Sequence, residues 1–440
     1  MVCHNIRPLI SLIALLALAG CASDKAYRPN LALCPMQEGA EKCAKHALLS
    51  YGSPSAEDYR LGFVEVDDQG QLRDRRQLQT VLDSFREIAS QQDVLLVTYV
   101  HGWHHNAHFE DENVQQFSSL LAKIGRAEAQ GSRRKVLGLY LGWRGESIPL
   151  PFFKYLTFWE RKGTAHEVGT NGVAELLLKL EEMVNVKEGL ETSEPKPRNS
   201  RMVVIGHSFG GAVVFTALQQ ILEDRFVDSR PGKTMTDTAK GFGDLVVLMN
   251  PAFEALRYAS LYDLSRERCT YFADQLPRLA ILTSEADWAT GLAFPAGRFF
   301  STLFESHNTL ERIYACAQQP QKVELREAEA DRNTVGHFEP FLTHTLHAAT
   351  ANRAASAGGL SIQRLKQLWI EQSPSATLHL DGTQLVHLGR THPLNPYLNI
   401  RVDAELIPDH NEIWDDRVVN FIADLIAVST LPLTPQTQAK

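Results

Sequence analysis

The sequence lacks extended runs of basic residues. Its 440 residues include 44 Lys and Arg against 52 Asp and Glu, which gives a formal net charge of −8. The basic clusters that do occur, "LRDRRQ" and "GSRRK", are short, and we interpret them as solvated surface. Because nucleic-acid-binding surfaces need a concentrated positive field, we expect no nucleic-acid partner. Internal repeats are also absent, and 44% hydrophobic residues suffice for a sizeable core.

The apolar run near the N-terminus lacks the length that spanning a bilayer requires. It reads "LISLIALLALAG" over residues 9–20, is uncharged and follows Arg7. Such a run is typical of a signal peptide, which we predict over residues 1–20. The run ends in Leu18-Ala19-Gly20-Cys21, which resembles the lipobox of bacterial lipoproteins.

The lipobox resemblance implies that Cys21 becomes the lipidated first residue of the mature protein. Ala22 and Ser23 follow it, without the aspartate that retains many such lipoproteins at the inner membrane. The resemblance therefore implies a protein of the bacterial cell envelope that is lipid-anchored, faces the periplasm and resides at the outer membrane. The membrane is then an expected partner through this N-terminal anchor.

Cysteine is scarce, with six residues in the whole chain. Cys3 would leave with the signal peptide and Cys21 would carry lipid. The four that remain permit two disulfides in an oxidising compartment, with three connectivities. The simplest pairing closes two short loops, and free buried thiols are the alternative: Cys34 with Cys43, and Cys269 with Cys316.

After residue 55, short apolar runs of strand length alternate with longer helical patterns. This alternation is typical of an α/β fold with a mostly parallel sheet, and near-continuous apolar strands favour helices on both faces. The predicted strands cover 60–67, 93–100, 135–143, 201–206, 244–250, 278–284 and 397–403, and the predicted helices cover 114–129, 170–186, 211–224 and 417–429.

The same pattern sets the domain boundaries. Residues 21–55 are predicted to be a tether and N-terminal extension, residues 56–430 the α/β domain, and residues 431–440 a C-terminal tail. An insertion at about 291–396 separates the last predicted strand from the one before it. Its beginning, "WATGLAFPAGRFFSTLF" (288–304), is rich in aromatic residues and is interpreted as a lid, an acyl-binding wall or plain core.

The sequence Gly-His-Ser-Phe-Gly at 206–210 joins a predicted strand to a predicted helix. A serine hydroxyl is a weak nucleophile until a base takes its proton, and a sharp strand-to-helix turn exposes it at the sheet edge. Gly206 and Gly210 lack the Cβ atoms that would clash in such a turn. His207 belongs to the same predicted turn. Ser208 is therefore the predicted nucleophile. The pattern alone can arise by chance, so Ser208 needs partners elsewhere in the chain.

The predicted strand at 93–100 ends in His101-Gly102. His101 is interpreted as supporting a turn by hydrogen bonding, and Gly102 as allowing the backbone to approach a substrate closely. The spacing of the histidines here fits no zinc motif well, and no H-E-x-x-H pattern is present, so we expect no metal or cofactor. The alternative of a metal site involves His101, His104, His105 and His108.

Four motifs together resemble the α/β-hydrolase superfamily, and in particular poorly characterised bacterial α/β-hydrolase proteins: "HGWHHNA", "LGWRG", "GHSFGG" and "DHNEIW". The resemblance implies an α/β-hydrolase fold with an insertion before the last strand. It further implies an oxyanion hole formed by the backbone N–H groups of Trp103 and Phe209. It covers residues 93–143, 201–290 and 397–426, and leaves 22–92 and 291–396 unexplained.

In this superfamily the catalytic acid usually follows the second strand after the nucleophile. Asp287, in "RLAILTSEADWATG", stands at that place. Glu285 is a close competitor, Glu254 lies one strand earlier, and a helix N-cap is the alternative role of Asp287. The chain order Ser…Asp…His then puts the base near the C-terminus, where His410 follows the last predicted strand.

The resemblance implies a serine hydrolase that cleaves lipid-like or small acyl esters of carboxylic acids. Ser208 would attack the carbonyl, His410 would act as general base, and Asp287 would orient its imidazole. An acyltransferase or thioesterase with the same triad is one alternative. A non-catalytic envelope lipoprotein that uses the fold as a binding scaffold is another. The completeness of the triad favours the enzyme.

Overall fold

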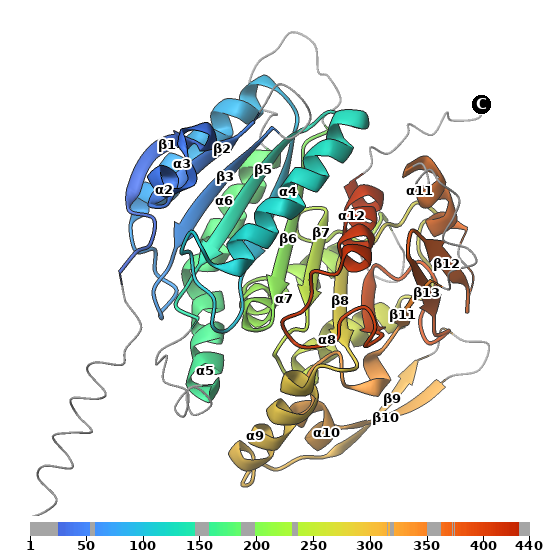
Figure 1. Ribbon diagram of the computed structural model, residues 1–440. Helices are drawn as coiled ribbons and strands as arrows, with labels where there is room; N and C mark the ends of the chain where they lie inside the picture. The colour runs from blue at the N-terminus through green and yellow to red at the C-terminus, as the bar shows by residue number, and fades with distance from the viewer. Residues whose placement is uncertain are drawn as a thin grey trace, which may run out of the picture.

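The structure, a computed structural model, describes residues 25–52, 58–145, 158–185, 199–230, 236–314, 316, 321–349, 362–371, 373 and 375–430. The predicted signal peptide, the lipidation site Cys21 and the C-terminal tail lie outside these residues. The described part forms a twelve-stranded sheet with helices against it, and a separate two-stranded sheet (Figure 1). The predicted α/β class with a mostly parallel sheet is confirmed.

The strands of the large sheet follow an order that differs from their order along the chain. The eight strands from β3 to β11 in this order are all parallel. Antiparallel pairs occur only towards the two edges, between β2 and β3, β11 and β13, and β13 and β12. The full order is β1 (Asn30–Pro35), β2 (His46–Tyr51), β3 (Tyr59–Glu65), β5 (Lys135–Gly142), β4 (Val94–Val100), β6 (Arg201–His207), β7 (Leu245–Met249), β8 (Leu279–Ser284), β14 (Tyr397–Val402), β11 (His344–Ala348), β13 (Thr383–His387) and β12 (Thr377–Leu380).

Helices cover both faces of this sheet. In Figure 1, α4 (Glu112–Gln130) and α12 (Asp416–Thr430) lie over the near face, and α6 (Ala174–Asn185) and α7 (Phe209–Asp228) lie behind it. All seven residues of β4 and all five of β7 are buried, because strands between two helical layers have no solvated side. The other helices are α2 (Ala40–Cys43), α3 (Arg75–Gln91), α5 (Phe158–Val168), α8 (Ala255–Glu267), α9 (Phe294–Ser301), α10 (Glu327–Arg332) and α11 (Ile362–Ile370).

The N-terminal extension is part of the domain. Residues 30–51, within the predicted tether and N-terminal extension over 21–55, contain β1 and β2, which lengthen the sheet beyond β3. β1 lies at the edge of the sheet and leaves half of its six side chains exposed. It therefore lacks the continuous apolar run that marks the interior strands.

Both disulfides of the simplest predicted pairing are present. One joins Cys34 in β1 to Cys43 in α2, within the N-terminal extension. The other joins Cys269, after α8, to Cys316, after β9 (Thr309–Tyr314). The second disulfide thus ties the insertion to the helix that follows β7.

The insertion at about 291–396 has two parts. The first contains α9, the antiparallel hairpin of β9 and β10 (Gln321–Arg326), and α10. The second contributes β11, β12, β13 and α11, so it extends the large sheet beyond β14. The stretch 288–304 forms a π-helical turn, η4 (Ala289–Ala293), and α9. Phe294 is buried, but most of the large apolar side chains of this stretch are exposed. The interpretation of the stretch as plain core is therefore wrong for those side chains.

Candidate active site

Ser208 stands between the end of β6 and the start of α7. Its backbone has φ 55° and ψ −121°, a conformation that residues other than glycine rarely adopt. Two hydrogen bonds hold the turn: the Ser208 N–H donates to the Met249 carbonyl (2.9 Å), and the Ala252 N–H donates to the Ser208 carbonyl (3.1 Å). The end of β7 therefore fixes a strained turn that keeps the serine at the carboxyl edge of the sheet.

Close backbone contacts explain the glycines of this turn. A Cβ on Gly210 would lie 2.1 Å from the Val100 carbonyl oxygen, and one on Gly206 would lie 2.8 Å from the Gly210 carbonyl oxygen. A Cβ on Gly102, in the neighbouring turn after β4, would lie 2.7 Å from the Ser208 Cβ. Only glycine fits these positions, as the sequence pattern predicts.

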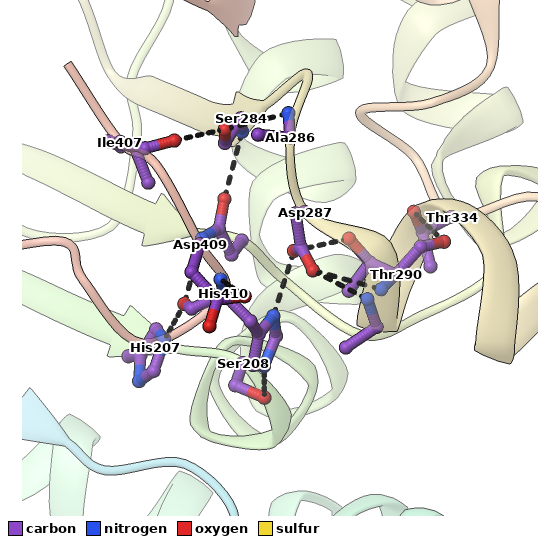
Figure 2. A network of polar contacts seen from close by, with 12 residues as sticks. His207, Ser208, Ser284, Ala286, Asp287, Thr290, Thr334, Ile407, Asp409 and His410 are labelled. Atoms are coloured by element: carbon purple, nitrogen blue, oxygen red, sulfur yellow. Dashed lines mark hydrogen bonds and ion pairs between the residues drawn. The ribbon is translucent and has the colours of Figure 1, made fainter. Parts of the chain in front are cut away.

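Ser208, His410 and Asp287 form a continuous chain of hydrogen bonds (Figure 2). The Ser208 Oγ lies 2.6 Å from Nε2 of His410, and Nδ1 of His410 lies 2.8 Å from Oδ2 of Asp287. All three residues are buried. They follow β6, β8 and β14, three strands whose carboxyl ends meet at one edge of the sheet.

Asp287 combines the two roles that the sequence left as alternatives. Its Oδ1 accepts hydrogen bonds from the N–H groups of Ala289 (3.0 Å) and Thr290 (3.1 Å), so it caps the start of η4. Its Oδ2 accepts from the Thr290 hydroxyl and faces His410. Burial would raise the pKa of Asp287, but positive charge on His410 and these hydrogen bonds outweigh it and lower the pKa. Asp287 is therefore ionised at neutral pH.

The two competing acids lie apart from the histidine. Glu285 is exposed, and its carboxylate accepts a hydrogen bond from the Ala404 N–H (3.2 Å). Glu254 is buried among cations: it pairs with Lys162, Arg257 (3.0 Å) and Arg298 (3.2 Å). Burial would raise the pKa of Glu254, but the positive charge beside it lowers the pKa to about 2. The carboxylate beside the His410 ring is that of Asp287, which leaves Asp287 as the acid that the geometry supports.

The backbone of His410 is held by two side chains. Nε2 of His207 donates to the His410 carbonyl oxygen (3.0 Å), and Nδ2 of Asn250 donates to the same oxygen (2.9 Å). The Oδ1 atom of Asn250 in turn accepts from the Ser284 N–H (2.9 Å). Asn250 was not singled out from the sequence. Its signal was available, because it is a polar residue directly after the buried strand β7.

His101 supports the turn after β4, as predicted. Its ring is fully buried, with Nδ1 directed at the Gly102 carbonyl oxygen (2.9 Å) and Nε2 accepting from the Trp143 N–H (3.0 Å). Burial lowers the pKa of His101 to about 4, so the ring is neutral. Gly102, the residue before Trp103, lies against Ser208, and Phe209 follows Ser208 at the start of α7. The oxyanion role of their N–H groups stays a prediction.

The histidines of 101–108 are directed at separate partners. The ring of His105 contacts Asp111 (3.1 Å) and Asn113 (3.2 Å). Within the described residues, the ligand atoms that come within 4.8 Å of one another belong to a different group: Glu305 and His307, between α9 and β9, and Asp331 in α10. In the histidine-rich turn, the ring of His105 is therefore engaged by neighbouring side chains of the same segment.

Comparison with protein-family models, with curated proteins and with solved structures finds no match to this chain. None of the described helices combines the length and the apolar character needed to cross a bilayer.

Proposed function

We propose that this protein is a serine hydrolase of the α/β-hydrolase type that cleaves carboxylic esters through an acyl-enzyme on Ser208. The hydrogen-bonded chain from Ser208 through His410 to Asp287 is the observation that carries the proposal. A buried serine hydroxyl on a strained turn, 2.6 Å from an imidazole that is itself oriented by a carboxylate, is the arrangement that activates a nucleophile.

The chemistry follows from this arrangement. Nδ1–H of His410 donates to Asp287, which leaves Nε2 free to accept the proton of Ser208. As Oγ attacks the ester carbonyl, Nε2 takes that proton and then gives it to the departing alcohol when the C–O bond breaks. Water, deprotonated by the same Nε2, attacks the acyl-enzyme and releases the acid. The N–H groups of Phe209 and Trp103 would stabilise the oxyanion.

Three features support the assignment to the α/β-hydrolase type. The serine occupies a G-x-S-x-G turn between a strand and a helix. The chain order is Ser208, Asp287, His410, which is the order of that superfamily. The acid follows β8, the second strand after the nucleophile, and the base follows the last strand, β14.

A fluorophosphonate probe tests the nucleophile. The purified protein should be labelled covalently, and Ser208→Ala should abolish the labelling. Ser119→Ala, which removes an exposed hydroxyl on α4, is the matched control and should label like the parent. A folded parent protein that stays unlabelled would exclude an activated serine. A panel of esters with graded acyl chains, with water or an alcohol as acceptor, then separates hydrolysis from acyl transfer.

We also propose that the protein is anchored in the bacterial envelope through a lipid on Cys21. The lipobox resemblance supports this proposal, and Cys21 lies outside the described residues. Metabolic labelling with a radioactive fatty acid should mark the wild-type protein, and Cys21→Ser should remove the label. Labelling that persists in Cys21→Ser would place the lipid on another residue, and a wild-type protein that takes up no label would exclude the anchor.

A further inference from the structure

The segment formed by η4, α9 and the turn after it presents a group of large apolar side chains to solvent. Their exposed fractions range from 44% for Phe299 to 102% for Phe304. Soluble proteins rarely leave apolar groups of this size together on one surface, and those that do use them for binding. We call this group the α9 apolar surface; it consists of Trp288, Leu292, Phe299, Phe300, Leu303 and Phe304.

The opposite side of the same segment is firmly packed. Phe294 is buried against Trp159 of α5, with ring centroids 5.6 Å apart. Gly297 also faces Trp159, because a Cβ at this position would overlap the indole ring. Thr302 is buried, and its hydroxyl donates to the Arg298 carbonyl oxygen (2.8 Å). The exposed apolar side chains are therefore held outward by a structured helix.

Charge is nearly absent from this segment. Arg298 is the single charged residue between 288 and 304. Its guanidinium turns inward, where it contacts Asp331 (2.5 Å) and Glu254 (3.2 Å). Arg332, outside this stretch, lies over the Phe299 ring (4.9 Å). Within 288–304 itself, a partner that docks by ion pairs would find no outward-facing charge, whereas the hydrocarbon of a bilayer needs only apolar area. The chemistry of the α9 apolar surface thus favours lipid over a charged protein partner.

The α9 apolar surface lies at the carboxyl edge of the sheet, beside the candidate active site. Trp288 is the residue after Asp287, and α9 continues directly from the turn that Asp287 caps. Figure 1 shows α9 at the lower edge of the molecule, below the carboxyl ends of the parallel strands. A surface that binds this segment would therefore also face the Ser208 side of the molecule.

The N-terminal end of the described chain lies at this same edge. The backbone N–H groups of Tyr27 and Arg28 donate to the carboxylate of Glu65, the last residue of β3 (both 2.8 Å). Lys25 lies near the end of β5, where it lines one small cavity with Gly142, Trp143 and Arg144. Cys21 is four residues earlier, which an extended chain spans in about 14 Å. From β5 to β8 the sheet is about 19 Å wide, so one plane can meet both the N-terminal segment and α9.

We propose that the α9 apolar surface docks on a lipid bilayer, with the carboxyl edge of the sheet turned towards the membrane. The described chain begins on this same edge at Lys25, four residues after the lipobox cysteine Cys21 that would carry the lipid, and this identifies the occupant as lipid. If the protein is the proposed ester hydrolase, this docking selects esters of membrane lipids as its substrates. This choice of substrate is the one consequence that rests on the proposed function. The docking itself requires no catalytic activity.

Vesicle binding of the chain from residue 22 onwards tests the proposal, since this chain keeps every described residue and lacks the lipid. It should sediment with vesicles of phosphatidylethanolamine and phosphatidylglycerol. The double variant Phe300→Ser/Phe304→Ser should bind at least about tenfold more weakly, because it removes apolar area from the docking surface. The matched control is Leu178→Ser/Val227→Ser, whose residues are 43% and 50% exposed on α6 and α7, and it should bind like the parent.

Two further measurements identify the mode of binding. Raising salt from about 0.1 M to about 1 M, which shortens the Debye length from about 10 Å to about 3 Å, should change binding less than about twofold. An environment-sensitive fluorophore attached at Phe304→Cys should shift to the blue with vesicles, and one at Val227→Cys should not. Ser208→Ala should bind vesicles like the parent, which separates docking from catalysis.

Three outcomes would overturn the proposal. The first is a parent chain that does not bind vesicles. The second is a Phe300→Ser/Phe304→Ser variant that remains folded by circular dichroism and binds like the parent. The third is a parent that sediments as a dimer in solution while the double variant is monomeric, since a second copy of the chain would then be the occupant of the α9 apolar surface.

Discussion

The imidazole of His207, the residue before Ser208, donates to the backbone carbonyl of His410, whose ring faces the Ser208 hydroxyl. One strand end therefore both carries Ser208 and positions its partner. His207 is buried, and burial together with the nearby charge of His410 lowers its pKa to about 3, so its ring stays a neutral donor.

Replacing His207 should impair catalysis without changing the triad itself. His207→Leu removes the donor to the His410 carbonyl, and we expect kcat to fall about 10- to 100-fold because a small displacement of the base suffices. KM for a small ester should change little. His207→Gln, which can still donate, should recover part of kcat. Steady-state kinetics on folded variants check this, and an unchanged kcat in His207→Leu would refute the positioning role.

Substitution of the acids should separate Asp287 from Glu285. Asp287→Asn disturbs the imidazole that Asp287 orients, and we expect kcat to fall by about 10⁴, as for the equivalent change in a serine protease. Glu285→Gln should leave kcat within about twofold, because that exposed carboxylate contacts the Ala404 N–H and not the base. Rates of ester hydrolysis with fluorophosphonate titration of active sites give the comparison. If Glu285→Gln lowered kcat more than Asp287→Asn, Glu285 would be the acid and Asp287 would not.

Stability should fall in mild acid because of the buried neutral histidines. Burial lowers the pKa of His101 to about 4 and that of His207 to about 3, whereas both rings titrate near pH 6.5 once unfolded. The unfolded chain therefore binds protons first, so this stability is complete above about pH 6.5 and is lost as the pH falls towards the folded pKa values. At pH 5, each of these two rings should lower the free energy of unfolding by about 2 kcal/mol.

Urea unfolding at pH 7.5 and pH 5 measures this loss. His207→Gln should show a smaller difference between the two pH values than the parent, whatever its stability at pH 7.5. His46→Gln, at a half-buried position near the surface, is the control and should keep the parent's difference. A parent protein that is equally stable at both pH values would contradict the prediction.

Removing the disulfide between Cys269 and Cys316 should destabilise the protein more than removing the one between Cys34 and Cys43. The first closes a separation of 47 residues and the second a separation of 9. Chain-entropy arguments give about 4 kcal/mol and about 3 kcal/mol for loops of these sizes. Thermal unfolding of the two double serine variants tests the ranking, with the reduced parent as reference. Equal or reversed losses would indicate that contacts around the disulfides dominate.

The interior of the fold was predictable because the interior strands are apolar on both sides. The predicted strand at 93–100 matches β4, and the predicted strand at 278–284 matches β8 within one residue. The edges were not predictable in the same way. β1 and β12 expose alternate side chains or more, and β12 has only four residues, so neither carries a run that stands out from loop sequence.

The candidate triad was predictable because each member lies in the segment that follows a recognisable strand. The support around it was less visible from sequence. Asn250 acts through a pairing between β7 and β8 that brings its side chain to Ser284, and only the strand order reveals that pairing. The hydroxyl of Thr290 donates to Asp287 because the first turn of η4 brings Thr290 next to the residue that caps it. The residue pattern does not encode this local geometry.

The position of β14 has a consequence for how the protein matures. β14 is the last strand of the described residues, yet it lies in the interior of the sheet between β8 and β11. Ser208 and His410 are separated by 202 residues, so a chain still being synthesised holds its serine without an imidazole beside it. The interior of the sheet is incomplete until β14 is inserted. Under the proposed function, a chain that ends before residue 397 should therefore not hydrolyse esters.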